Sequence, residues 1–297
     1  MTGTNSKEEV LIEALPYIQT YEGKTFVIKY GGAAMTEDYL RKTFAKDVTI
    51  LRKIGINIVI VHGGGKETTD VATQLGLKTE FVHGLRYTDE RMMNVILMVL
   101  AGKVNKEIVN SINTNGGNAV GLCGVDNNLL RARKLTNGAA DLGLVGEVTS
   151  VNTAFLNLLL QNAMMPVISP VGVGPEGELY NINADLAAGS IASALRAEKL
   201  VYLSDIEGIL VNRRLVSTLT RSEAQAHIRD GAIFGGMIPK VQSAFDTLNT
   251  GVNKVHIIDG RVKHSLLLEI FTDEGIGTQM IREEPIQQST PGNGTPG

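Results

Sequence analysis

The sequence is poor in cysteine and has no cluster of metal-binding residues. Cys123 is the single cysteine, so the chain cannot form an internal disulfide, and no group of His, Cys, Asp or Glu residues has metal-ligand spacing. These absences exclude a disulfide framework and predict no metal site built by the protein. They favour a reducing compartment, in which we expect Cys123 to be a buried thiol without chemistry of its own.

Long apolar runs and runs of basic residues are absent as well. No stretch approaches the roughly 18 consecutive apolar residues of a membrane span. Residues 1–9 have neither the hydrophobic core of a signal peptide nor the basic bias of a transit peptide. The net charge of -3 argues against a nucleic-acid partner. We therefore expect no membrane, no nucleic acid and a cytoplasmic location, or an organelle stroma if a transit segment is missing from the sequence.

The chain is nevertheless long and apolar enough for a large core. It has 297 residues, of which 43% are hydrophobic and 20% are charged. A chain of this size forms either two domains or one large one. We place a domain boundary near Asn183. The stretch after about Arg282 is rich in Pro, Gly, Ser and Gln, which predicts a disordered tail.

Two apolar runs that end in glycines lie close together in the sequence. Residues 25–34 (TFVIKYGGAA) carry Lys29 into a glycine pair, and residues 58–65 (IVIVHGGG) end in three glycines. For either run alone, a buried strand with an ordinary glycine turn is the simpler interpretation. Between them, Thr36 can cap a helix that ends near Gly55. Strand, helix and strand predict a crossover with parallel strands, which places both glycine loops at one carboxyl edge and favours phosphate binding there.

The rest of the chain alternates between predicted helices and strands, which indicates an α/β fold. A capping box at residues 6–9 starts a helix with a kink at Pro16, and its apolar stripe packs either on its own body or on another subunit. The later expected elements are helices over about 66–75 and 89–112, a short strand ending at Cys123, a hairpin turn at 126–128, a helix after Ser150, a strand over 165–169, a hairpin within 171–182, a helix over 185–197, a strand over 199–203, a capping box at Thr220 and Glu223, a helix from about 235 to 251, and a final strand over 254–258.

Two glycine loops and well-separated lysines suit phosphoryl transfer. This reaction spreads negative charge over the transferred group, and fixed ammonium and amide donors counter that charge. The commonest phosphate-binding motifs are missing. Residues 65–66 are followed by glutamate instead of Ser or Thr, residues 23–25 lack the first glycine of a Walker A loop, and neither a Gly-x-Gly-x-x-Gly fingerprint after the first strand nor the protein-kinase set is present.

Five motifs occur in order along the chain: VIKYGGAAM (27–35), HGGG (62–65), GLRYT (84–88), YNINAD (180–185) and GGMIPK (235–240). Together they resemble the N-acetyl-L-glutamate kinase family, and the likeness runs from about residue 16 to residue 281. It implies the amino-acid kinase fold, a three-layer αβα sandwich with a mainly parallel central sheet and two lobes, plus a kinked N-terminal helix. The implied divisions are an N-terminal tail and interlacing helix (1–23), an amino-acid-substrate lobe (24–183), a nucleotide lobe with a C-terminal arginine segment (184–283) and a disordered tail (284–297).

The resemblance implies a reaction in which ATP phosphorylates the γ-carboxylate of N-acetyl-L-glutamate, a step of arginine synthesis. Lys29 and Lys240 would flank the transferred phosphoryl group, and Asp185 would organise their ammonium groups. The nucleophile is a carboxylate with a reference pKa of about 4.3, so it needs no base, and we expect His62 only to shape its loop. Mg2+ would be carried largely by the ATP phosphates.

Substrate and nucleotide contacts are implied in the same way. N-acetyl-L-glutamate would contact Gly64, Gly65, Arg86 and Asn181. A guanidinium can bind both oxygens of a carboxylate, although outside this motif a surface salt bridge is the commoner role for an arginine such as Arg86. For Asp205 and Gly208, a helix cap and its turn is the alternative interpretation. The implied nucleotide contacts are Gly31, Gly32, Asp205, Gly208 and Gly236.

The stretch 264–278 resembles a segment found in arginine-inhibited members of the family, which also carry a helix before the first strand. In those members the helix links dimers into a hexameric ring, and arginine binds between the helix and this segment. The resemblance implies a hexamer built as a trimer of dimers, with arginine as inhibitor at Tyr17, Glu269, Gly275 and Gly277. An amphipathic closing helix with a glycine stop explains the segment without arginine. Whether a PII signalling protein binds stays undecided.

Two other functions remain open from the sequence. A kinase of the same fold that acts on another carboxylate, as in the aminoadipate type, would keep both lysines, and a panel of substrates separates it. A non-catalytic arginine-binding sensor would be expected to lose a catalytic lysine, whereas both Lys29 and Lys240 are present.

Overall fold

The computed structural model describes residues 7–82, 84–136, 141–272 and 275–283. Ser6, the first residue of the predicted capping box, lies outside these ranges, as does the predicted tail at 284–297. The helix expected after Ser6 is α1 (Lys7–Tyr21), and Pro16 lies inside it. None of the described helices combines the length and the apolar content that a membrane crossing requires.

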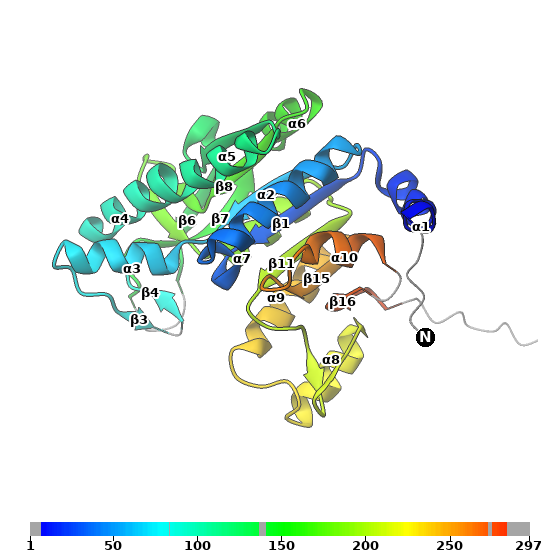
Figure 1. The fold of residues 1–297 in the computed structure, drawn as a ribbon. Helices are drawn as coiled ribbons and strands as arrows, with labels where there is room; N and C mark the ends of the chain where they lie inside the picture. Colours follow the sequence, from blue (N-terminus) through cyan, green and yellow to red (C-terminus); the bar gives the residue numbers. More distant parts are fainter. Residues whose placement is uncertain (1–6, 83, 137–140, 273–274, 284–297) are drawn as a thin grey trace, which may run out of the picture.

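Eight strands form one central sheet in the order β14-β16-β15-β11-β1-β2-β8-β5 (Figure 1). Every neighbouring pair is parallel except β15 with β16, so the predicted α/β fold with a mainly parallel sheet is confirmed. Because β1 pairs with β11, the sheet runs unbroken across the boundary expected near Asn183. The strands are β1 (Thr25–Tyr30), β2 (Asn57–His62), β5 (Ala119–Cys123), β8 (Met165–Ser169), β11 (Lys199–Ser204), β14 (Thr218–Leu219), β15 (Lys254–Asp259) and β16 (Thr278–Met280).

Helices cover both faces of the sheet, which confirms the three layers. Phe26 of β1 packs with Phe44 in one hydrophobic core, whereas the adjacent Val27 packs with Ile191 in the other. This follows from the strand geometry, because successive side chains point to opposite faces. The first face carries α2 (Asp38–Lys53), α3 (Gly65–Gln74), α4 (Glu90–Ile96), the π-helix η2 (Leu97–Val104), α5 (Asn105–Thr114) and α10 (Ser265–Phe271), and the second carries α6 (Thr153–Gln161), α7 (Ala184–Ala194), α8 (Arg221–Arg229) and α9 (Met237–Asn249).

A small closed barrel of four strands adjoins α7. The hairpin predicted within residues 171–182 is confirmed, because β9 and β10 pair antiparallel. The hairpin turn predicted at residues 126–128 is wrong. The strand before this turn, β5, pairs with β8 in the central sheet, whereas the strand after it, β6, pairs with β7 and β9 in the barrel. The remaining elements are β6 (Leu130–Lys134), β7 (Val145–Val151), β9 (Val171–Val173), β10 (Leu179–Ile182), β3 (Phe81–Val82), β4 (Leu85–Arg86), β12 (Leu210–Val211), β13 (Arg214–Leu215), and the 3-10 turns η1 (Gly32–Met35) and η3 (Asp126–Asn128).

Two predicted element ends and one prediction of strand order need correction. The helix expected to be capped by Thr36 begins at Asp38, with Glu37 at the cap position. The helix expected over residues 185–197 ends at Ala194, because Arg196 has a φ of +48° that does not continue a right-handed helix. The strand at 254–258 is not the last one, since β16 follows it. A strand of three residues is too short to show a periodic pattern.

Other local predictions are confirmed. The strand at Met165–Ser169 has the predicted bounds, and Thr220 and Glu223 form the predicted capping box. The long helix expected over 89–112 is present as α4, η2 and α5 in one continuous run. Cys123 ends β5 as a free, buried cysteine, and burial raises the pKa of its thiol.

Candidate active site

The two glycine loops meet at the carboxyl ends of β1 and β2, as predicted. The strands are parallel, and Tyr30 is in register with His62. The amide of Gly63 donates a hydrogen bond of 2.8 Å to the carbonyl oxygen of Tyr30. The loops also touch, since a Cβ atom on Gly63 would lie 3.8 Å from the Cα atom of Gly31. This edge therefore presents bare backbone from both loops.

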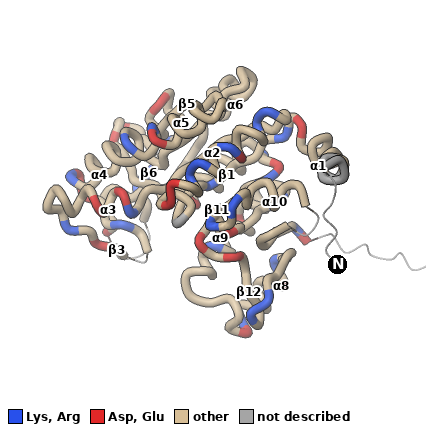
Figure 2. Tube along the Cα trace, viewed as in Figure 1, with Lys and Arg blue, Asp and Glu red and all other residues tan. Residues whose placement is uncertain are grey.

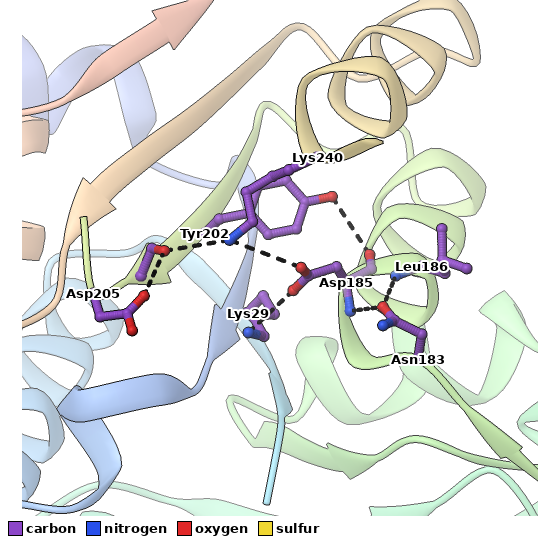
Figure 3. A network of polar contacts seen from close by, with 8 residues as sticks. Lys29, Asn183, Asp185, Leu186, Tyr202, Asp205 and Lys240 are labelled. Carbon is purple, nitrogen blue, oxygen red and sulfur yellow. Dashed lines mark hydrogen bonds and ion pairs between the residues drawn. The ribbon is translucent and has the colours of Figure 1, made fainter. Parts of the chain in front are cut away.

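Lys29, Asp185 and Lys240 gather beside these loops (Figure 3). The Nζ atom of Lys29 lies 3.0 Å from Oδ1 of Asp185, and the Nζ atom of Lys240 lies 3.9 Å from Oδ2. The first contact is an ion pair and not an aligned hydrogen bond. The three residues come from β1 and from the first turns of α7 and α9. The prediction that Asp185 lies near both lysines is confirmed.

Local structure explains how these side chains converge. Lys29 follows Val27 on the strand face that packs against α7, because strand side chains alternate. At the start of α7, the Asn183 side chain accepts hydrogen bonds from the amides of Asp185 and Leu186, at 2.9 Å and 3.2 Å. This cap fixes the turn that carries Asp185, and an acidic residue is favoured there by the helix dipole.

The site brings two lysine ammonium groups close together. Figure 2 shows basic and acidic residues interspersed along the chain, so overall charge does not mark the site. Here, the ammonium groups of Lys29 and Lys240 face the carboxylate of Asp185, and the carboxylate of Asp205 also acts on Lys240. Burial and the charge of Lys29 lower the pKa of Lys240, while the carboxylates of Asp185 and Asp205 act in the opposite direction. The Nζ atom of Lys240 also donates to Oγ of Ser204 at 3.3 Å. A partly desolvated cation pair of this kind attracts an anionic group.

The expected nucleotide residues lie next to the same edge. A Cβ atom on Gly32 would lie 3.9 Å from the backbone nitrogen of Asp205. Asp205 and Gly208 line a cavity of about 470 Å3, and Gly236 is the N-terminal cap residue of α9. Gly208 has a φ of +138°, a backbone conformation that a residue with a side chain would adopt only under strain. Other residues of this cavity were not predicted; they include Ile206, Ile209, Ala232, Phe234 and Met237.

The expected substrate residues form a connected group. The guanidinium of Arg86 is buried and donates to the carbonyl oxygen of Gly65 and to Oγ1 of Thr69, both at 2.8 Å. Asn181 donates to Oγ1 of Thr88 at 3.1 Å, and Thr88 in turn donates to the carbonyl oxygen of Arg86. Within the described ranges Arg86 forms no ion pair, so it does not match the alternative of a surface salt bridge.

The residues of the expected arginine site lie apart from Lys29 and Asp185, on α10 and the segment after it. Glu269, Gly275 and Gly277 line one cavity of about 500 Å3. The carboxylate of Glu269 accepts from Nδ1 of His256 at 2.6 Å and from the amides of Ile276 and Gly277. Burial alone raises the pKa of Glu269, but these donors outweigh burial and lower it.

Tyr17, the fourth residue of that expected site, lies on α1. Its ring meets the ring of Phe271 on α10 edge to face, with centroids 6.5 Å apart. The structure therefore places the N-terminal helix against the same helix that carries Glu269.

Sequence patterns did not indicate several polar partners in this site. Ser204, Thr69 and Thr88 contact Lys240, Arg86 and Asn181 respectively. Ser204 had a signal of position, because it precedes Asp205 at a strand end. Thr88 ends the motif at residues 84–88, but nothing in that motif indicated its contact with Asn181, and Thr69 lies in a helix, where a threonine carries no mark of its role.

Comparison with known proteins agrees with this geometry. Residues 24–259 match the model of the amino acid kinase family, and the chain belongs to that family. Within it, the chain is 57% identical to an acetylglutamate kinase of Pelodictyon phaeoclathratiforme over 280 residues, which cover 94% of this chain and 92% of that protein. The resemblance expected from the five motifs is thereby confirmed.

Two solved structures share the fold. An N-acetylglutamate synthase from Neisseria gonorrhoeae, complexed with coenzyme A and N-acetyl-glutamate, has a TM-score of 0.84 and 30% identity, and the match covers 94% of this chain. This chain spans only 64% of that synthase. The same synthase complexed with coenzyme A and L-arginine has a TM-score of 0.81 and 28% identity, with 94% of this chain and 66% of the synthase covered.

Proposed function

We propose that this chain transfers the γ-phosphoryl group of ATP to the side-chain carboxylate of N-acetyl-L-glutamate, in arginine biosynthesis. The observation that carries the proposal is the convergence of Lys29, Lys240 and Asp185 beside two glycine loops. The identity to acetylglutamate kinases supports the choice of substrate. A sensor without catalysis is disfavoured, because both lysines face the same carboxylate.

In the proposed reaction, a substrate carboxylate oxygen forms a bond to the γ-phosphorus while the bond from that phosphorus to the bridging oxygen of ADP breaks. Negative charge moves to ADP, and no proton has to be removed because the nucleophile is already ionised. Lys29 and Lys240 stabilise the charge on the transferring and leaving oxygens. Asp185 holds the two ammonium groups in place before ATP binds.

The substrate and nucleotide contacts follow from the same arrangement. Arg86 and Asn181, with the amides of Gly64 and Gly65, bind N-acetyl-L-glutamate, and the Gly64 amide also donates to the transferred phosphoryl group. Gly31, Gly32, Asp205, Gly208 and Gly236 contact ATP, and the cavity beside Asp205 takes the base. Among the described residues no three His, Cys, Asp or Glu side chains lie close enough to hold a metal ion. Mg2+ would enter the site with ATP, because it binds mainly through phosphate oxygens and water.

The test is ATP-dependent hydroxamate formation, in which hydroxylamine traps the acyl phosphate product. Wild-type protein should form hydroxamate with N-acetyl-L-glutamate in preference to aminoadipate, aspartate and glutamate. Lys240→Ala should lose most of this activity. Its matched control is Lys24→Ala, because Lys24 is an exposed lysine just before β1. A wild type that yields no hydroxamate with N-acetyl-L-glutamate contradicts the proposed function.

We also propose that arginine inhibits the enzyme at the cavity lined by Glu269, Gly275 and Gly277, with Tyr17 as a lid. The acidic side chain in that cavity and the arginine complex of the Neisseria gonorrhoeae synthase support this. Arginine titrated against the initial rate should lower the rate, and Glu269→Gln should weaken the response. A flat response up to millimolar arginine contradicts the proposal.

A hexamer built as a trimer of dimers, in a cytoplasmic compartment, completes the proposal. The side chains of Ile12 and Leu15 on α1 are 69% and 51% exposed, so an apolar part of this helix is open to another subunit. The free, buried Cys123 suits a reducing compartment. Light scattering should show more subunits per oligomer for the full chain than for a chain that starts at Gly23. The same number of subunits in both contradicts the role of α1.

A further inference from the structure

His62 and Asn105 form a polar pair in the interior of the molecule. His62 is the last residue of β2 and Asn105 is the first residue of α5, and both are 0% exposed. Nδ2 of Asn105 lies 3.2 Å from Nε2 of His62. A fully buried polar pair costs free energy unless each group finds a partner, so the network around it indicates what it does.

The network defines which ring nitrogen of His62 carries the proton. Nδ2 of Asn105 also lies 2.8 Å from the carbonyl oxygen of Val167 and 3.3 Å from that of Leu122, and Oδ1 of Asn105 accepts from Nζ of Lys106 at 3.1 Å. These contacts leave Asn105 in one orientation, with its amide nitrogen toward His62. The carbonyl oxygen of Gly63 only accepts and lies 2.7 Å from Nδ1 of His62, so the proton resides on Nδ1. Nε2 then carries the lone pair, which faces the amide nitrogen of Asn105, a group that only donates.

The protonated nitrogen holds the glycine loop. Nδ1 of His62 donates to the carbonyl oxygen of Gly63 at 2.7 Å. In a planar trans peptide the C=O and the following N–H point in opposite directions. The carbonyl of Gly63 turns toward the buried ring, and the N–H of Gly64 therefore turns away from it. Within the described part of the chain, this N–H has no hydrogen-bond acceptor.

A helix closes on the other side of this loop. The π-helical stretch η2 ends immediately before Asn105, and its residues Leu100 and Val104 pack against Gly64 without room for a Cβ atom. Gly64 has a φ of +145°, which a side chain would not tolerate. Asn105 directly follows this stretch, so the helix that packs against the loop also carries Asn105.

The ring of His62 stays neutral under ordinary conditions. Burial lowers its pKa to about 4, and the nearby charge of Lys106 acts in the same direction. A protonated ring would also place an N–H against the amide nitrogen of Asn105, which cannot accept it. The hydrogen bond to Gly63 therefore persists over the pH range in which carboxylate substrates are ionised.

We propose that His62 and Asn105 are positioning residues for phosphoryl transfer: Asn105 keeps the proton on Nδ1 of His62, and His62 aims the Gly64 amide at the reacting groups. This inference rests on the proposed function, because it requires the Gly64 amide to act in the reaction. It assigns neither residue a contact with substrate or a proton transfer.

Two amide substitutions of His62 separate positioning from mere packing. In His62→Asn the side-chain nitrogen can occupy the position of Nδ1 and still donate to Gly63. In His62→Gln the amide extends to the position of Nε2, where it can accept from Asn105 but does not reach Gly63. We expect kcat for hydroxamate formation to fall about 10- to 100-fold in His62→Gln, with KM changed less than about 3-fold, because one aligned donor at the transferred group is worth up to about 100- to 1,000-fold. His62→Asn should stay within about 5-fold of wild type.

The control is His227→Asn on α8, far from the loop in sequence and outside the site, which should leave kcat unchanged. Thermal unfolding of each variant shows whether it is folded. Equal kcat values for His62→Asn and His62→Gln, in folded proteins, overturn the role of His62. The two failures are distinguishable. An inactive wild type overturns the proposed function and this inference with it, whereas an active wild type with equal kcat values in the two His62 variants overturns this inference alone.

Asn105 is tested through its coupling to His62. Asn105→Leu removes the donor and should lower kcat about 10-fold where His62 is present, because the ring can then take the other tautomer. In the His62→Asn background the same substitution should cost less than about 3-fold, since an amide has no tautomer to fix. Equal costs in both backgrounds remove Asn105 from the pair.

Discussion

Two carboxylates of this molecule have opposite surroundings. The side chain of Asp185 is 27% exposed and faces two ammonium groups on long, flexible side chains. The side chain of Glu269 is 5% exposed and accepts from a buried imidazole and two backbone amides. The partners of Asp185 can turn to an incoming anion, whereas the partners of Glu269 belong to the fold itself. We therefore expect loss of Asp185 to impair chemistry and loss of Glu269 to impair stability.

The largest expected effect is the loss of kcat when one of the two lysines that face Asp185 is removed. Lys240→Ala should lower kcat by about 1,000-fold, or about 4 kcal/mol of transition-state stabilisation, because it removes a positive charge that stabilises the transferred phosphoryl group. Steady-state hydroxamate assays measure this, with Lys24→Ala expected to match wild type. A loss below about 5-fold in Lys240→Ala would place the chemistry elsewhere.

The next effect is on stability. Glu269→Ala leaves His256 and two amides without their acceptor, and removing one partner of a buried pair costs about 3 kcal/mol or more. Urea unfolding should show this loss, whereas Asp185→Ala should cost less than about 1 kcal/mol because its pairs are partly solvated. Similar losses for the two variants would mean that the exposures do not distinguish the carboxylates.

Asp185→Asn and Glu269→Gln compare the two carboxylates by their effect on kcat. The amide keeps the size of the side chain but no longer attracts Lys29 and Lys240, so kcat should fall about 10- to 100-fold with unfolding unchanged. The matched substitution Glu269→Gln should leave kcat without arginine near the wild-type value. If Glu269→Gln lowers kcat as much as Asp185→Asn does, the two regions are not functionally separate.

The smallest expected effect is a pH dependence of stability at the Glu269 cluster. Burial lowers the pKa of His256, although Glu269 opposes this, and its donors lower the pKa of Glu269. For both groups the unfolded chain binds protons at higher pH than the folded chain does. The contribution of this cluster to stability is therefore complete above about pH 6.5. It falls below that pH because His256 takes up a proton when the chain unfolds, and it falls further below about pH 4.3 because Glu269 then does the same. Urea unfolding at pH 7.5, 6 and 5 should show a weaker decline in His256→Asn than in wild type.

How much was predictable differs between these two regions. Lys29, Asp185 and the glycine loops were predicted together, because each belongs to a motif at the end of a strand or the start of a helix. Parallel pairing then brings those ends to one edge. At Glu269, the family resemblance suggested a ligand for arginine, but nothing in the sequence showed that His256 already occupies one of its oxygens.

Local sequence thus determined the elements that short-range chemistry controls: the two glycine-ended strands, the capping box at Thr220 and the hairpin within residues 171–182. Only tertiary structure decided the pairs His62 with Asn105 and His256 with Glu269, the turn at 126–128 that leads from sheet to barrel, and the added strand β16. The physical reason is range. Caps, turns and periodic faces depend on residues a few positions apart, whereas a buried hydrogen bond depends on two distant segments that packing brings into contact.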